Sequence, residues 1–372
     1  MKIVHTSDWH IGRYLSGYSL IEGQRYFLKQ LEELLVQEDV DLLLVAGDVF
    51  HSSIPSAEGI TLLETFLSRL VLERGIEVVL IAGNHDSPQR LEAFHRLLER
   101  EGLWIQGSLS LEMKVVSRQK EGKTTGIFLL PFFQPASVRE LFGDVSPKTC
   151  DEALQCLLER YQPDPAQYDY SILMAHGFYL PISGETLIRC DSELTVGGVD
   201  GMSLRRFPHF DYIALGHLHL PQRAGDFGFY SGSPLAYSVS ESVCPKGVRL
   251  LETKPDGGID STFVPISPLY PVRELTGSLL ELLEQPSEDF VAIHLTDNEY
   301  QPEDFRRLRA AFPHILNLQY QNITFDSVSD ATDSALKKPE EIWREFYRKT
   351  TGQEATSSEN SFFYRALQEV LE

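Results

Sequence analysis

The chain has few cysteines and no long apolar run. Its four cysteines, Cys150, Cys156, Cys190 and Cys244, contain no Cys-x-x-Cys pair among 372 residues. This scarcity excludes a disulfide framework and a thiolate metal cluster. No apolar stretch reaches the roughly 18 residues that a transmembrane helix needs, and the N-terminus opens on a strand-like run instead of a basic, then apolar, signal segment. We therefore expect a soluble, cytoplasmic protein that does not enter a membrane.

Positive charge is also scarce, because 33 Lys and Arg stand against 54 Asp and Glu, for a formal net charge of −21 at pH 7. Nucleic-acid-binding proteins usually show a basic footprint, since phosphate neutralisation supplies much of their affinity. None is visible over the whole chain. The candidates for a local one are Arg13, Arg90, Arg205, Arg206 and Lys246. If the substrate is a nucleic acid, the positive charge that attracts it must therefore come from a metal cluster in the site, or a partner protein must bind the nucleic acid.

Five short polar segments each follow an apolar, strand-like run. The runs are Ile3 to Thr6, Val40 to Ala46, Ile76 to Ala82, Tyr170 to Met174 and Tyr212 to Leu215. The segments that follow are Asp8-Trp9-His10, Gly47-Asp48-Val49-Phe50-His51, Gly83-Asn84-His85-Asp86, Ala175-His176-Gly177 and Gly216-His217-Leu218-His219. A single Asp-x-His or Gly-Asp pair more often forms an ordinary turn than a metal site, because Asp, Asn and Gly favour turns. Five in order behind five buried strands indicate a two-metal phosphoesterase site.

Phosphodiester hydrolysis explains these residue types. Two divalent ions about 3.5 to 4 Å apart activate water and neutralise charge on the phosphate oxygens. Asp48 is the predicted bridge, because a carboxylate offers two oxygens. Asp8, His10 and His219 would complete the first ion, and Asn84, His176 and His217 the second. Imidazole and carboxylate ligands without thiolate suit Mn, Fe, Co or Zn better than Mg or Ca.

Two histidines remain after the ligands are assigned. His85 follows a ligand asparagine and precedes Asp86, whose carboxylate would fix the tautomer of the imidazole, so His85 is the predicted general acid for the leaving oxygen. His51 lies three residues beyond Asp48, and a turn there would place it near the phosphate. We assign His51 to phosphate positioning.

Longer segments carry a family resemblance. They are Thr6-Ser7-Asp8-Trp9-His10-Ile11-Gly12-Arg13, Gly83-Asn84-His85-Asp86-Ser87-Pro88, Glu193-Leu194-Thr195-Val196-Gly197-Gly198, Gly216-His217-Leu218-His219-Leu220-Pro221-Gln222 and Tyr230-Ser231-Gly232-Ser233-Pro234-Leu235-Ala236-Tyr237. Together they resemble the SbcD family, the nuclease subunits of bacterial SbcCD complexes within the calcineurin-like metallophosphoesterase superfamily. The resemblance covers at least residues 1 to 245, and more loosely the remainder.

The resemblance implies a DNA nuclease that uses two Mn²⁺, trims duplex ends, opens hairpins and works with the SMC-like ATPase SbcC. It also implies a homodimer of this chain within a heterotetramer. The family's ligand roles fall on the seven ligands assigned above, and its catalytic histidine falls on His85. Position 51 departs from many bacterial members, which have Asp there, whereas archaeal and eukaryotic relatives have His.

The order of predicted elements indicates an α/β fold. Helical spacing over Glu22 to Glu38 and Ala57 to Arg74 alternates with the first strands, as in layered α/β proteins. Members of the resembled family pack two β-sheets face to face with helices outside. We predict a phosphoesterase domain over residues 1–265 and a small α/β capping domain, for DNA recognition, over 266–328. Its predicted elements are Tyr270 to Leu275, Leu279 to Leu283, Phe290 to Leu295, Pro302 to Phe312 and Ile315 to Phe325.

Residues 329–372 form a linker and a predicted helical tail. Two short helices, Pro339 to Thr350 and Ser361 to Leu371, carry more aromatic and apolar residues than they can bury against each other alone. Either they fold back on their own capping domain, or, as the family suggests, they dock on the base of the ATPase coiled coil. The predicted partner-binding residues are Ile342, Trp343, Phe346, Tyr347, Phe363 and Leu367.

Fold and site alone do not fix a substrate. The first rival function is a soluble metallophosphatase or cyclic-nucleotide phosphodiesterase with the same ions. The capping domain and the aromatic tail disfavour it, because such enzymes usually stop near the last metal motif. The second rival is a non-catalytic scaffold, which the full set of ligand and catalytic positions disfavours.

Overall fold

The structure of the chain is a computed structural model. It describes residues 1–181, 186–193, 201–297, 302–320, 343–344, 347–348, 353–356, 359–360 and 363. Two compact units are present, Met1–Gln319 and Tyr320–Glu372. None of the helices in the described part combines the length and apolarity needed to cross a bilayer.

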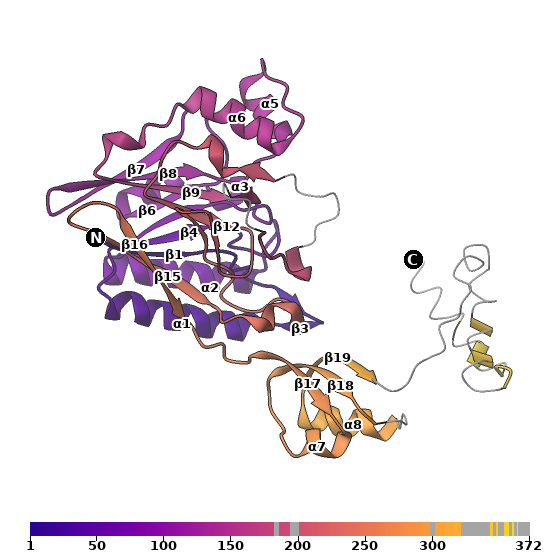
Figure 1. The fold of residues 1–372 in the computed structure, drawn as a ribbon. Helices are drawn as coiled ribbons and strands as arrows, with labels where there is room; N and C mark the ends of the chain where they lie inside the picture. The colour runs from indigo at the N-terminus through magenta and orange to yellow at the C-terminus, as the bar shows by residue number, and fades with distance from the viewer. Residues whose placement is uncertain are drawn as a thin grey trace. The chain divides into compact units, whose positions relative to one another are not determined.

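Two six-stranded sheets form the body of the first unit (Figure 1). The first sheet has the order β16 (Ile259–Pro265), β15 (Gly247–Thr253), β1 (Lys2–Thr6), β4 (Leu42–Ala46), β5 (Glu77–Ile81) and β6 (Leu103–Gln106). The second has the order β13 (Gln222–Ala224), β14 (Gly228–Tyr230), β12 (Tyr212–Gly216), β9 (Tyr170–His176), β8 (Lys123–Leu130) and β7 (Lys114–Lys120). Neighbours from β1 to β6 run parallel, as do β8, β9, β12 and β14.

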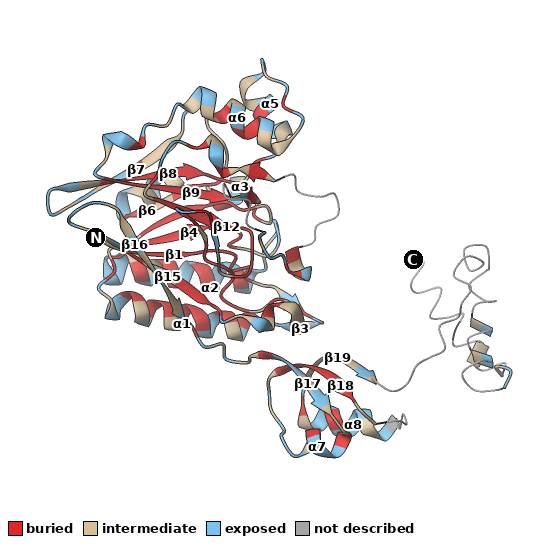
Figure 2. Ribbon diagram, viewed as in Figure 1, coloured by how far each residue is buried: buried red, intermediate tan, exposed pale blue. Residues whose placement is uncertain are grey.

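Helices cover the outer face of each sheet. Helix α1 (Ile21–Gln37) and helix α2 (Ala57–Ser68), which continues as the π-helical turn η1 (Arg69–Arg74), contribute to the apolar cluster on the first sheet. Helices α5 (Pro135–Phe142) and α6 (Cys150–Tyr161) contribute to the cluster on the second. Figure 2 shows the strands as a buried interior between partly exposed helices. The prediction of two face-packed sheets flanked by helices is confirmed.

Successive residues of a strand pack into different apolar clusters, because their side chains point to opposite faces of the sheet. On β4, Leu42 and Leu44 belong to the cluster between the two sheets, whereas Leu43 and Val45 belong to the cluster under α1 and α2. A strand buried on both faces reads as a continuous apolar run. The predicted runs therefore lie within two residues of the observed strands.

Other elements connect these layers. The short helices are α3 (Pro88–Leu91), α4 (His95–Leu98), η2 (Glu99–Glu101), η3 (Pro165–Gln167), η4 (Asp191–Glu193), η5 (Leu204–Arg206) and η6 (Val239–Val243). The small strands are β2 (Tyr14–Leu15), β3 (Tyr18–Ser19), β10 (Tyr179–Leu180) and β11 (Met202–Ser203). The sequence analysis did not identify β6, β7 and β8, which complete one edge of each sheet.

Residues 266–320 form a smaller α/β layer. Its sheet has the order β17 (Val272–Gly277), β18 (Phe290–Leu295) and β19 (His314–Tyr320), with helices α7 (Leu279–Leu283) and α8 (Pro302–Ala311). The alternation of strands and helices follows the predicted order. The Tyr18 ring lies 6.0 Å from the Phe290 ring and 5.2 Å from the His314 ring. The domain boundaries at 265 and 328 stay a prediction.

Part of the tail is described. The rings of Trp343 and Phe363 stack with centroids 4.9 Å apart, and Trp343 Nε1 donates to Asn360 Oδ1 at 3.1 Å. The Tyr347 ring lies 5.3 Å from that of Trp343. Three predicted partner-binding residues, Ile342, Phe346 and Leu367, lie outside the described residues.

Candidate metal centre

Parallel strands bring the polar segments together. Strands β1, β4 and β5 run parallel, so Asp8, Asp48 and Asn84 follow them at one edge of the first sheet. Strands β9 and β12 are parallel in the second sheet and carry His176 and His217 at their ends. The sheets meet at this edge, because His176 Nδ1 donates to the carbonyl oxygen of Ala46 at 2.8 Å.

The first cluster contains Asp8, His10 and His219, all buried, whose ligand atoms lie within 4.8 Å of one another. The Nε2 atoms of His10 and His219 are 3.1 Å apart. Burial lowers the pKa of both imidazoles, so both are neutral at pH 7. A cation between them would receive a lone pair from each ring.

The second cluster is centred on the amide oxygen of Asn84. It lies 3.1 Å from Nε2 of His176 and 3.1 Å from Nδ1 of His217. Because Nδ1 of His176 donates to a carbonyl, its Nε2 is the nitrogen that is free to bind a metal. Burial lowers the pKa of His176 to about 3. These three side chains are the ones predicted for the second ion.

Asp48 lies between the clusters. Its Oδ2 atom is 3.6 Å from Nε2 of His10 and 3.6 Å from Nε2 of His176. Its Oδ1 atom accepts the backbone N–H of His85 at 2.8 Å. One carboxylate oxygen therefore faces both sets of ligands, as a bridging ligand must.

The electrostatics of the site fit divalent cations. Burial raises the pKa of Asp8 to about 8, and burial together with Asp86 raises the pKa of Asp48 well above its usual value. Among the described residues, no Lys or Arg forms an ion pair with either carboxylate. Buried carboxylates are stabilised by cations, and neutral imidazoles are metal ligands. The seven predicted ligands thus form a donor set that suits two divalent ions.

The two remaining histidines lie beside the first cluster. The His85 ring is 4.7 Å from the His10 ring and stacks at 5.5 Å on the His51 ring. The Nδ1 atom of His85 donates to the carbonyl oxygen of His51 at 3.0 Å, which leaves Nε2 without that bond. His10, His51 and His85 bring ligand-type nitrogens within 4.8 Å of one another.

Comparisons with known proteins assign the chain to a family. Residues 1–221 match the family described as calcineurin-like phosphoesterase. The chain belongs to this family. Residues 268–351 match the family described as the type 5 capsule protein repressor C-terminal domain. As a member of the phosphoesterase family, the chain has a site for two divalent metal ions, and the clusters above hold its candidate ligands.

Two full-length relatives of the phosphoesterase are SbcD subunits of the nuclease SbcCD. The one from Staphylococcus epidermidis is 31% identical over 100% of this chain and 99% of its own length. The one from Staphylococcus saprophyticus is 29% identical over the same shares. Among solved structures, the E. coli phosphoesterase Yfce covers 72% of this chain at 16% identity and a TM-score of 0.30.

The structure gives Asp86 a different role from the predicted one. Its carboxylate accepts backbone N–H bonds from Val49, Phe50 and Gly83 at 3.1, 2.9 and 2.9 Å. The group that faces Nδ1 of His85 is the His51 carbonyl. The prediction that Asp86 orients His85 is therefore wrong, and Asp86 joins the two phosphoesterase loops that follow β4 and β5.

The sequence analysis missed several residues of the phosphoesterase site. They form hydrogen bonds to the candidate ligands or to one another. Ser7 Oγ donates to Asp8 and lies 2.8 Å from Ser231 Oγ. Glu193 accepts the backbone N–H of His219, and Glu241 lies against its ring. Ser231 and Glu193 belong to segments quoted for the family resemblance, so those segments were the signal that could have identified them.

Proposed function

We propose that this phosphoesterase is a Mn-dependent DNA nuclease subunit, acting with an SbcC-type SMC-like ATPase in the cytoplasm to trim duplex ends and open hairpins. The observation that carries the proposal is the Asp48 carboxylate, which faces two ligand clusters at equal distances of 3.6 Å. The full-length likeness to SbcD subunits of the nuclease SbcCD supports a DNA substrate and the ATPase partner.

Each side chain of the site has a distinct role in the proposed reaction. Two bound divalent ions would supply an activated water and neutralise phosphate charge. Asp8, His10, Asp48 and His219 would hold one ion, and Asp48, Asn84, His176 and His217 the other. His85 gives a proton to the leaving oxygen, and His51, stacked on it at 5.5 Å, positions the phosphate. The His51 carbonyl orients the His85 ring.

Manganese is the proposed ion. Nitrogen and oxygen ligands also admit Zn, Fe and Co. Titration of metal-free protein with each ion, followed by DNA cleavage, tests the choice. We expect the highest turnover with Mn, and full activity with Zn but none with Mn would contradict it.

A substrate panel separates the proposed function from its rival. Purified protein with Mn is given labelled duplex, single-stranded and hairpin DNA, alongside a chromogenic phosphate bis-ester. We expect cleavage of duplex ends and hairpins at higher kcat/KM than the small ester. A higher kcat/KM for the ester than for every DNA form would favour a metallophosphatase or cyclic-nucleotide phosphodiesterase.

The proposed homodimer has a candidate face beside the site. Exposed apolar side chains occur in the loop before α2, on η1 and at α4: Ile54 is 72%, Leu72 66%, Phe94 76% and Leu97 64% exposed. A groove of about 620 Å³ lies in the same region and is lined by Ile54, Leu67 and Leu72, among others. Apolar patches of this kind mark association sites. A second copy of the chain is the proposed occupant.

The oligomeric state tests this face. Light scattering should give a dimer for the wild type and a monomer for Leu72→Glu. Val36→Glu is the matched control, because Val36 is 50% exposed on α1, outside the residues lining the groove. A monomeric wild type, or a dimeric Leu72→Glu, would refute this interface.

A further inference from the structure

His219 is held from behind by charged residues that have no metal-binding assignment. Glu241 Oε1 lies 3.1 Å from Nδ1 of His219 and accepts a bond from Ser192 Oγ at 2.5 Å. Its other oxygen, Oε2, accepts bonds from Lys246 Nζ at 2.5 Å and Ser233 Oγ at 3.1 Å. Glu241 is fully buried, so its carboxylate contacts protein groups and not solvent.

Lys246 reaches the same histidine by a second route. Its Nζ donates to the backbone carbonyl oxygen of His219 at 2.9 Å, as well as to Glu241. One ion pair therefore holds His219 at both its ring and its main chain. Breaking a buried pair by removing one partner leaves an uncompensated charge, so the two residues depend on each other.

The ring geometry explains what the pair does for the metal ligand. Nδ1 of His219 faces the carboxylate of Glu241 at 3.1 Å and Ser192 Oγ at 2.9 Å, whereas Nε2 faces Nε2 of His10 in the first cluster. Because the Ser192 hydroxyl donates its proton to Glu241, its oxygen can also only accept from Nδ1. A carboxylate beside one ring nitrogen places the proton there, because a carboxylate only accepts hydrogen bonds. The opposite nitrogen then keeps its lone pair for a metal.

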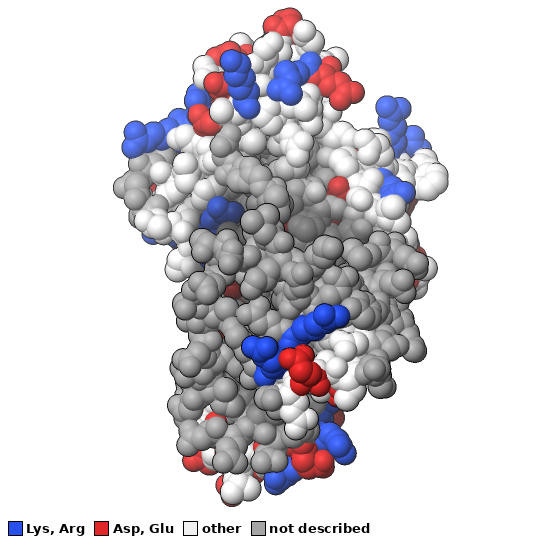
Figure 3. Space-filling view, turned by 90° about the vertical axis from the view of Figure 1, so that its right-hand side faces the viewer, with Lys and Arg blue, Asp and Glu red and all other residues white. Residues whose placement is uncertain are grey.

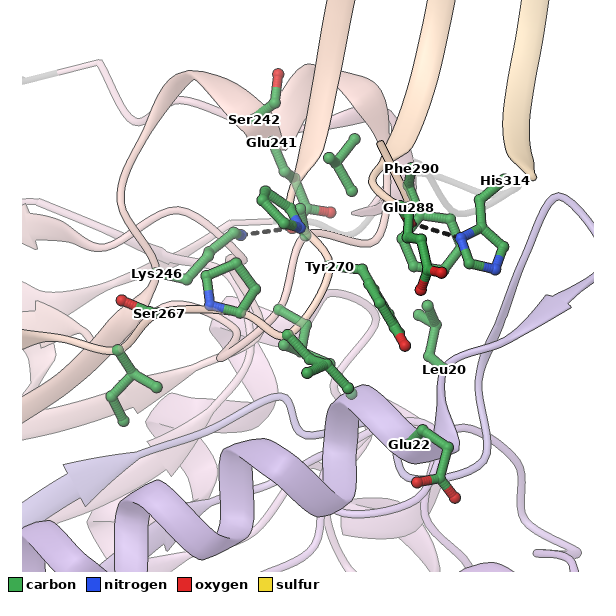
Figure 4. A pocket seen from close by; sticks show the side chains of 18 of the residues that line it. Leu20, Glu22, Glu241, Ser242, Lys246, Ser267, Tyr270, Glu288, Phe290 and His314 are labelled. Atoms are coloured by element: carbon green, nitrogen blue, oxygen red, sulfur yellow. Dashed lines mark hydrogen bonds and ion pairs between the residues drawn. The ribbon is translucent and has the colours of Figure 1, made fainter. Parts of the chain in front are cut away.

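We propose that Glu241, fixed by Lys246, is the positioning residue that sets the tautomer and orientation of His219 as a metal ligand. The proposal rests on the proposed function only in taking His219 as a ligand. Figure 4 shows the ion pair. Glu241 and Lys246 also line a pocket of about 700 Å³, where Tyr270, Phe290 and His314 come from the 266–320 layer. The positioning pair thus lies between the metal cluster and that layer.

Glu241→Ala and Glu241→Leu test the proposal, with Glu32→Gln as the matched control. Glu32 is also buried and ion-paired, with Arg69 and Arg74, but it lies on α1 away from the metal ligands. Calorimetric titration with Mn should show a loss of about 10- to 100-fold in affinity at one site in Glu241→Ala, as is typical for residues that support a ligand. Glu32→Gln should keep the wild-type affinity.

The tautomer of His219 distinguishes a positioning role from a merely structural one. If Glu241 only stabilised the fold, its removal would leave the tautomer unchanged. Nitrogen-15 spectra of metal-free protein labelled in histidine, with His219 assigned from a His219→Asn variant, should show the proton on Nδ1 in the wild type and Glu32→Gln. In Glu241→Ala it should shift to Nε2 or become shared. Glu241→Leu keeps a similar side-chain size and offers no acceptor, so it serves where Glu241→Ala does not fold.

An unchanged tautomer together with an unchanged Mn affinity in a folded Glu241 variant would overturn the proposal. Failure of the proposed function gives a different pattern. In that case the wild type would bind no Mn, or would not cleave DNA, while the shift of the His219 proton on removing Glu241 would still be observed.

Discussion

At the residue scale, four of the seven predicted metal ligands occupy a backbone conformation that most residues avoid. Asp8, His10, Asp48 and His217 all have positive φ, at 54°, 44°, 51° and 110°. Such conformations cost of order 1–3 kcal/mol each and persist only where the surrounding structure imposes them. The strand ends thus hold the ligand carboxylates and imidazoles at a cost in stability.

Gly83 provides the sharpest steric constraint on the bridging carboxylate. A Cβ atom at Gly83 would overlap the carboxylate and backbone nitrogen of Asp48, whereas one at Gly75 would meet no atom. We predict that Gly83→Ala displaces Asp48 and loses at least one metal ion. Gly75→Ala should keep both ions and lower the free energy of unfolding by about 1 kcal/mol, because Gly75 has a φ of +68°. Elemental analysis and chemical denaturation measure the two effects.

Full metal content in Gly83→Ala would show that the loop after β5 can move away from Asp48 without loss of the site. The close approach of the two loops would then be unimportant for metal binding.

At the element scale, the sequence could predict that the seven candidate ligands lie together, because each lies within four residues of the end of a strand. Their binding of metal stays a prediction. A strand-end motif is local, and parallel strands bring such ends to one edge. Glu241 and Lys246 could not be found this way, because they contact His219 across 22 and 27 residues. Asp86 was misassigned because its partners are backbone N–H groups, whose directions depend on the folded loops.

A buried histidine links the two sheets. Nδ1 of His5 on β1 lies 3.0 Å from the Tyr212 hydroxyl on β12, between the faces that pack together. Burial, reinforced by the charge of Arg249, lowers the pKa of His5 to about 3. An unfolded histidine titrates near 6.5, so below that pH the unfolded state binds more protons and the native state loses stability.

We predict that in metal-free protein His5 contributes about 3 kcal/mol of destabilisation as the pH falls from 6.5 to 4. His5→Leu should flatten this part of the curve of unfolding free energy against pH. Exposed His209 is the control, and His209→Leu should keep the wild-type slope. Urea denaturation at several pH values gives the slopes, and equal slopes for His5→Leu and wild type would be evidence against this account.

At the scale of the whole molecule, the acidic charge works against the proposed binding of DNA. On the described part of the face in Figure 3, Lys and Arg are separated and several lie next to Asp and Glu. Two basic residues considered for the mouth of the site are paired, Arg206 with Asp151 and Lys246 with Glu241. A net charge of −21 opposes the approach of DNA to the isolated chain.

We predict weak duplex binding by the isolated chain at physiological salt, and much tighter binding in complex with the ATPase. Each phosphate contact adds about 0.9 to the slope of log affinity against log salt, so the slope should be shallow for the chain and steep for the complex. Fluorescence anisotropy with a His85→Ala variant and bound metal measures both. Tight binding by the chain alone, with an equally steep slope, would contradict this prediction and indicate a basic track on the chain itself.

The tail is the proposed link to the ATPase. Removal of residues 331–372 should leave metal content unchanged and abolish co-purification with SbcC from the same organism, because the two helices predicted from the sequence could not stabilise their aromatic residues by propensity alone. Undiminished binding by the truncated chain would favour the alternative, in which the tail folds back on its own capping domain.

The central claim is that Asp48 bridges two ions while His85 delivers a proton without binding metal. Bound metal, measured by elemental analysis alongside DNA turnover in Asp48→Ala and His85→Ala, tests it most directly. We predict that Asp48→Ala loses at least one ion and all activity. His85→Ala should keep near wild-type metal content and lose about 10² to 10⁴-fold in turnover. Equal metal loss in the two variants would make His85 a ligand and contradict the account.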